Sequence, residues 1–99
     1  MTLEEIVGKL NSLDEELVIF VKRHDGNYSG LSEAVLLVLS EEEQEMKTFE
    51  IAAQKCPGFE YFLEVFIAKE VVEDLTESNN SEVLSKKIER IIHYAEYDA

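Results

Sequence analysis

The sequence predicts an α+β fold: a small three-stranded antiparallel sheet packed against an N-terminal and a C-terminal helix. Three apolar runs predict the strands. Residues 17–22 and 34–39 are short and rich in β-branched and other apolar side chains, as buried strands are. Residues 60–66 alternate between two faces. Towards both ends of the chain, apolar residues recur every three or four positions, which is typical of amphipathic helices that cover a sheet.

The length of the chain, 99 residues, predicts one domain spanning residues 1–99. The composition is strongly acidic, with 22 Asp and Glu against nine Lys and Arg and a net charge of −13. Such a chain lacks the basic stripe that binds a nucleic-acid backbone, and anionic membrane surfaces would repel it. The same charge would attract a basic protein. We therefore expect a basic protein partner, and neither nucleic acid nor membrane.

The N-terminal segment, residues 2–13, predicts an amphipathic helix. Thr2 followed by Glu5 forms a capping box at its start. The acidic beginning is unlike a signal peptide, and no run of about 18 apolar residues follows, so we expect a cytoplasmic location. One face of the helix carries Leu3, Ile6, Val7, Leu10 and Leu13.

Two connections follow. Residues 24–30 are rich in types that tolerate positive φ. From Asp25 onwards the segment begins like a calcium-binding loop, but Leu36 stands at the twelfth position, where that motif needs Glu, so we interpret the segment as a turn. In the second connection, Ser40 and Glu43 form another capping box. Residues 41–56 then show only partial helical periodicity, which leaves open a helix or an excursion over the sheet.

The densest apolar run, residues 57–75, predicts a strand that continues into a helix, because the period changes at Ala68. One long helix over residues 59–77 is the competing interpretation. Its first half would be apolar nearly all round, which a small domain has little room to bury. Alternation puts Tyr61, Leu63, Val65 and Ile67 on one face of the strand, and Phe62, Glu64 and Phe66 on the other.

The last helix follows a polar break at residues 76–81, where Asn79 and Glu82 supply a predicted cap. Glu82 with Lys86, and Glu89 with His93, are favourable pairs one turn apart. The predicted apolar face consists of Val83, Leu84, Ile88, Ile91, Ile92 and Ala95.

No motif predicts catalysis, a cofactor or a metal site. Cys56 is the single cysteine, so no intrachain disulfide forms, and we interpret it as a small buried residue. His24, His93 and Cys56 have no zinc-ligand spacing. Phosphate loops, dinucleotide fingerprints and nucleophile elbows are missing. We expect a protein that is not an enzyme and holds no cofactor.

Glu64 is the carboxylate that stands out, because it lies between aromatic residues in the predicted third strand. If it is buried it needs a partner, and Lys22 or Arg23 would supply one if the two strands are neighbours. A partly exposed sheet face is the alternative. Aromatic side chains beside a carboxylate also suit a protein partner and its Arg. The partner-binding candidates are Tyr61, Phe62, Glu64 and Phe66.

Blocks spread over most of the chain, residues 18–23, 32–35, 60–65, 69–71 and 94–99, resemble a family of small, acidic, uncharacterised bacterial proteins. The Y-F-L-E-V and Y-A-E-x-D-A blocks are the most specific. Similar small acidic proteins often act as immunity proteins that neutralise the toxin of a bacterial rival. The resemblance therefore implies such a role for this chain, and it carries no catalytic residues to transfer.

These observations lead to one leading expectation and two alternatives. The leading expectation is a non-catalytic protein-binding module, an immunity protein in its narrowest form, that occludes a basic toxin with its carboxylates. The first alternative is a small ligand-binding domain or enzyme that uses Glu64 and the 24–30 loop. The second is a structural homodimer subunit.

Overall fold

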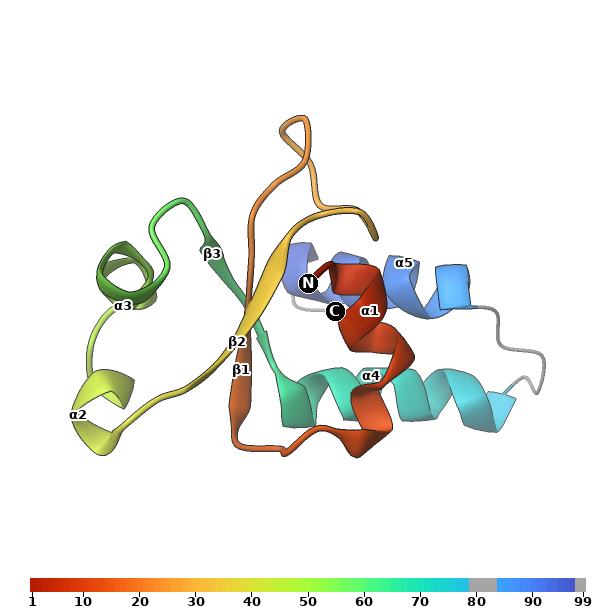
Figure 1. The fold of residues 1–99 in the computed structure, drawn as a ribbon. Helices are drawn as coiled ribbons and strands as arrows, with labels where there is room; N and C mark the ends of the chain where they lie inside the picture. The colour runs from red at the N-terminus through yellow and green to blue at the C-terminus, as the bar shows by residue number, and fades with distance from the viewer. Residues whose placement is uncertain (79–83, 98–99) are drawn as a thin grey trace.

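The structure is a computed structural model that describes residues 1–78 and 84–97. It places helices on both faces of a central sheet (Figure 1). Helices α1 (Leu3–Gly8), α4 (Val65–Ser78) and α5 (Leu84–Tyr97) cover one face, where they enclose the main core. On the other face lie two short helices, α2 (Glu41–Gln44) and α3 (Thr48–Lys55), over a smaller core.

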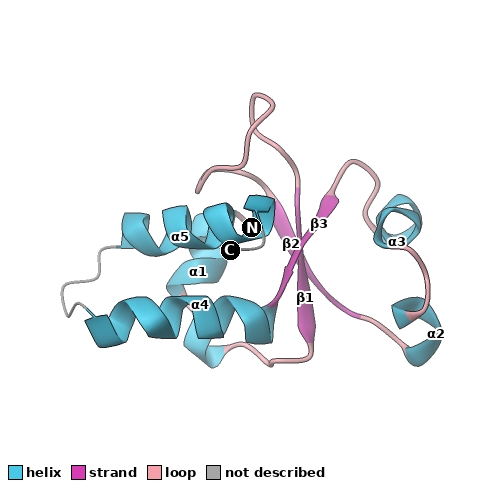
Figure 2. Cartoon of the chain, turned by 180° about the vertical axis from the view of Figure 1, so that it is seen from behind, coloured by secondary structure: helices cyan, strands magenta, loops and turns pink. Residues whose placement is uncertain are grey.

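The sheet has three antiparallel strands, as predicted. Strand β1 (Leu17–Val21) lies between β2 (Ala34–Val38) and β3 (Glu60–Glu64) and is antiparallel to both (Figure 2). Because both of its edges are paired and both of its faces are covered, β1 is apolar along its whole length. The N-terminal and C-terminal helices contact each other across the main core. The α+β architecture predicted from the sequence is therefore confirmed.

A bulge in β3 overturns the predicted alternation. Ile19 lies opposite Leu63, but its neighbour Phe20 lies opposite Tyr61, so Phe62 is an extra residue in the ladder. As a result Phe62 and Leu63 both enter the main core, and Tyr61 packs against the smaller core. The expectation that Tyr61 and Leu63 share a face is wrong. The helix also begins at Val65, earlier than the predicted change of period at Ala68.

The predicted N-terminal helix is shorter than expected. Helix α1 ends at Gly8, and a separate 3-10 turn, Leu10–Ser12, follows it. Gly has a weak helical preference, which favours the break. The predicted capping box is confirmed, since Glu5 N–H donates to Thr2 Oγ1 at 3.2 Å and the Glu5 carboxylate accepts from Thr2 N–H at 3.0 Å. The bond from Thr2 N–H, and then a bond that Thr2 Oγ1 donates to the same carboxylate at 3.1 Å, lower the pKa of Glu5.

The segment after β2 is helical, but in two pieces. Ser40 caps α2 and forms the predicted capping box with Glu43. Lys55, in the last turn of α3, places Nζ 2.8 Å from Glu43 Oε2 and so joins the two helices. The hydrogen bond from Lys55, and then the bond from the backbone of Ser40, lower the pKa of Glu43.

The predicted loop between β1 and β2 contains a tight turn at its tip. His24 and Asn27 exchange two backbone hydrogen bonds, of 2.7 and 3.1 Å. Between them, Asp25 has φ of 52° and Gly26 has φ of 83°. Positive φ at both central residues defines a type I′ turn, for which Asp-Gly is a preferred pair. The turn stands clear of the rest of the molecule (Figure 1).

Two glycines provide a matched test of this turn. Replacing Gly26 by Ala will lower the free energy of unfolding by about 1–2 kcal/mol, because a Cβ strains the left-handed backbone. Replacing Gly8 by Ala will raise it by about 0.5–1 kcal/mol, because a Cβ there meets open space in a helix. Urea denaturation measures both changes. Equal effects of the two substitutions would contradict the turn assignment.

The described part of the last helix agrees with its predicted apolar face. Ile88 and Ile91 are buried, and Leu84, Ile92 and Ala95 pack against the main core. Val83, the Asn79 and Glu82 cap and the Glu82 pair with Lys86 lie outside the described residues. The pair of Glu89 with His93 remains a prediction.

Candidate protein-binding groove

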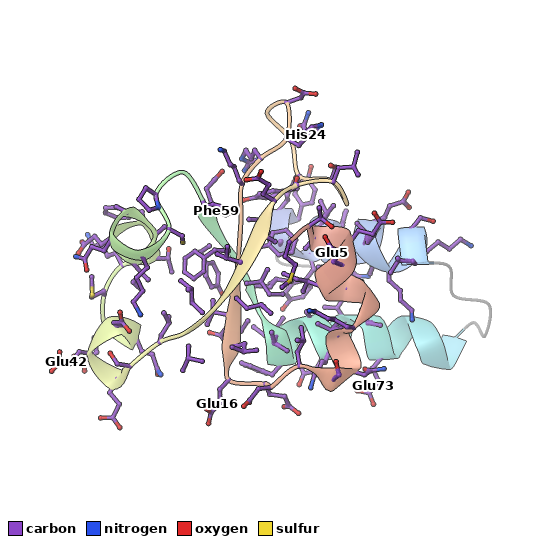
Figure 3. All side chains as sticks on the ribbon, viewed as in Figure 1. Glu5, Glu16, His24, Glu42, Phe59 and Glu73 are labelled. Carbon is purple, nitrogen blue, oxygen red and sulfur yellow. The ribbon has the colours of Figure 1, made fainter. Side chains whose placement is uncertain are left out.

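A groove with a volume of about 700 Å³ opens between the sheet and the α2–α3 pair. It lies where β1 begins and where β2 and β3 end. Figure 3 places Glu16 at this end of β1, below the sheet. We call it the acidic groove and define it by its lining: Glu15, Glu16, Val18, Val38, Leu39, Gln44, Met46, Thr48, Ile51, Tyr61, Glu64 and Phe66.

Antiparallel pairing brings these distant segments together. Val38 lies beside Leu17 at one edge of β1, and Glu64 lies beside Val18 at the other. The outer wall is held by α2, where Gln44 Nε2 donates to the carbonyl of Leu39 at 3.2 Å. With the ion pair that joins α2 to α3, this bond fixes the wall against the end of the sheet.

The floor of the groove is apolar. Val18 and Ile51 are buried in the smaller core, and half-buried Leu39, Met46 and Tyr61 pack around them. Two short helices leave the end of this sheet face open. Apolar side chains therefore reach the surface at the rim, where Val38 is 59% and Phe66 is 41% exposed.

Three carboxylates line the groove, and two of them have no basic partner in the part of the chain that the structure describes. Lys69 Nζ lies 3.9 Å from Glu15 Oε2 and donates to the carbonyl of Leu13 at 2.7 Å. Within residues 1–78 and 84–97, no Lys or Arg pairs with Glu16 or Glu64. The groove thus combines an apolar floor with uncompensated negative charge.

Three of the four predicted partner-binding residues meet in the acidic groove: Tyr61, Glu64 and Phe66. The fourth, Phe62, is 2% exposed in the main core, where its ring lies edge-on to Tyr28 with centroids 5.1 Å apart. The bulge explains the difference, because it separates Phe62 from Glu64 and places Tyr61 and Glu64 on the same side of the sheet. Phe62 is a core residue and offers no surface to a partner.

The predicted pairing of Glu64 with Lys22 or Arg23 is wrong. Strands β1 and β3 are neighbours, as the prediction required, but Arg23 Nε donates to Glu60 Oε2 at 2.9 Å. In an antiparallel pair the end of one strand meets the beginning of the other. Glu60 therefore lies near Arg23, and Glu64 lies at the opposite end of the sheet.

Arg23 belongs to a cluster at the base of the loop. Its guanidinium carbon lies 4.1 Å from the centre of the Tyr28 ring, and Tyr28 packs in turn on Phe62. Partial burial, and then the charge of Glu60, raise the pKa of Tyr28. These contacts anchor the 24–30 loop far from Glu64, so the two parts do not combine into the one site that the enzyme interpretation needs.

Sequence reasoning missed Glu15, Glu16 and Met46 as lining residues. Carboxylates are so frequent in this chain that none of them stands out by type. Met46 belongs to the segment with partial periodicity. Glu15 and Glu16 directly precede β1, a signal that becomes useful once the strand order is known, whereas Met46 lies between α2 and α3.

The remaining candidates offer no second site. Cys56 is buried, as predicted, and its burial raises the pKa of the thiol, which keeps it a poor nucleophile. The described residues contain no group of three or more His, Cys, Asp and Glu able to hold a metal ion. Nor does any described helix have the length and apolar character needed to span a membrane.

Comparison with protein-family models, with curated proteins and with solved structures finds no match to this chain. The resemblance to small acidic bacterial proteins therefore remains a prediction.

Proposed function

We propose that the protein is a non-catalytic binding module whose acidic groove takes up a basic, partly apolar segment of another protein. The observation that carries this proposal is the pair of uncompensated carboxylates, Glu16 and Glu64, beside exposed Val38 and Phe66. Glu60 and Glu43, by contrast, already have internal cations. Glu16 and Glu64 are available for cations of a partner.

Binding would proceed in two steps. The overall charge of −13 draws in a basic protein from a distance, because electrostatic complementarity mainly accelerates association. An apolar side chain of the partner then enters the groove, and Lys or Arg pairs with Glu16 and Glu64. Phe66 supplies an exposed aromatic surface for an Arg side chain.

The narrower form of the proposal is an immunity protein. In that role the carboxylates of the acidic groove would occupy the site where a nuclease-type toxin binds phosphates. The acidic charge and the resemblance described above support this form. It predicts a partner that loses its activity when the complex forms.

Salt dependence tests the proposal. The tagged protein, incubated with a lysate of its source cells, will capture a basic protein at low salt and release it at high salt. Screening is the reason, since the Debye length falls from about 10 Å at 0.1 M to about 3 Å at 1 M ionic strength. Mass spectrometry identifies the released protein. A captured protein that is acidic, or that resists 1 M salt, would contradict the proposal.

A further inference from the structure

The outer edge of β2 lacks the features that normally protect an edge strand. Its sequence, A-V-L-L-V, has no charge, no Pro and no bulge. The opposite edge strand, β3, has a Glu at each end, a bulge in its ladder and helix α3 packed beside it. Unprotected apolar edges are templates for another strand. Protection of β3 alone indicates that β2 has a different role.

Hydrogen-bond directions identify the open part of this edge. Ala34 N–H points away from β1 and donates to the carbonyl of Met1 at 2.7 Å. Because these directions alternate along a strand, Leu36 and Val38 also present their N–H and C=O groups outward. Among the described residues, no backbone bond reaches these outward groups. The N-terminal segment covers the first position, and Leu36 to Val38 stay open.

The open edge continues into the acidic groove, since Val38 belongs to both. Carboxylates lie near both ends of β2: Glu33 precedes the strand, and Glu16 lines the acidic groove where the strand ends. An extended segment with Lys or Arg at its ends would match this charge. A second copy of the chain would not, because it brings another charge of −13 to the same edge.

We propose that an extended, basic segment of the partner pairs with β2 at Leu36 and Val38 and adds a fourth strand to the sheet. Main-chain hydrogen bonds would provide the pairing, and the next residues of the segment would enter the acidic groove. This inference names the binding mode and rests on the proposed function.

The test uses ¹⁵N-labelled full-length protein and a capped octapeptide of alternating Lys and Val, the Lys peptide. The charge control is the Glu peptide, in which Glu replaces each Lys. On addition of the Lys peptide, amide exchange of Leu36 and Val38 will slow by about tenfold or more, because these N–H groups become hydrogen-bonded. The Glu peptide will leave the exchange unchanged. Protection that rises with protein concentration, without peptide, would overturn the proposal in favour of a second copy.

A pair of variants isolates the main-chain bond. Val38→Pro removes an outward N–H, which an edge strand tolerates, and will weaken binding of the Lys peptide by about tenfold. Val38→Ala removes most of the same side chain but keeps the N–H, so it will weaken binding less than Val38→Pro does. Equal weakening by the two substitutions would assign the loss to the side chain and would refute edge pairing. If both bind like the parent, edge pairing is refuted. Should Val38→Pro fail to fold, amide exchange in the parent protein still decides.

The two proposals can fail separately. Peptide-induced changes confined to Tyr61 and Phe66, with Leu36 and Val38 unaffected, would refute edge pairing and leave the acidic groove as the site. Protection of Leu36 and Val38 that persists after charge reversal in the groove would support edge pairing and refute the role of the groove. No binding of the Lys peptide would refute edge pairing.

Discussion

Replacing Glu16 and Glu64 together by Lys will abolish capture of the basic partner. Both carboxylates line the acidic groove, and neither has an internal cation in the described part of the chain. Reversal turns two attractive contacts into two repulsive ones. Since close charge pairs across an interface each contribute about 1.4 kcal/mol or more, affinity will fall on the order of 100-fold. Capture from lysate, and titration once the partner is known, measure the loss.

A second charge reversal provides the control. Replacing Glu73 and Glu89 by Lys changes the net charge by the same amount, from −13 to −9, since each replacement adds two charges. Both residues are exposed and lie on α4 and α5, across the sheet from α2 and α3 (Figure 3). This variant will keep most of its capture. Equal loss in both variants would assign binding to the overall charge and would refute the acidic groove.

Replacing Phe62 by Ala will lower the free energy of unfolding by about 3–5 kcal/mol, the usual cost of removing a buried aromatic side chain. Phe62 is 2% exposed in the main core and contacts Tyr28 edge-on. For a domain of this size the melting temperature will fall by roughly 20 °C. Urea denaturation with an unchanged slope, together with thermal melting, measures the effect.

Phe66 is the matched aromatic residue for this test, because it is 41% exposed at the rim of the acidic groove. Phe66→Ala will cost only about 1 kcal/mol of stability and will weaken capture. The two variants therefore distinguish an aromatic residue needed for stability from one needed for binding the partner. If Phe62→Ala kept its stability but lost capture, Phe62 would be a contact residue and the bulge would be misplaced.

Local patterns were sufficient to predict part of the secondary structure. The strands at β1 and β2, and both capping boxes, were predictable because each depends on residues within a few positions of one another. The exposed turn at Asp25 and Gly26 was predictable for the same reason. The acidic charge, which limits the kind of partner, follows from composition alone.

Pairing between distant segments determined which face of the sheet each side chain of β3 occupies and how the acidic groove is assembled. The alternation of residues 61–67 contains no sign of a bulge, because a bulge is a mismatch with the partner strand rather than a property of β3. Through that mismatch Phe62 is buried while Tyr61 reaches the acidic groove. The order β2-β1-β3 then places Val38 and Glu64 on either side of the start of β1. The groove exists only in the folded sheet, because its lining comes from residues far apart in the chain whose contacts form when the strands pair.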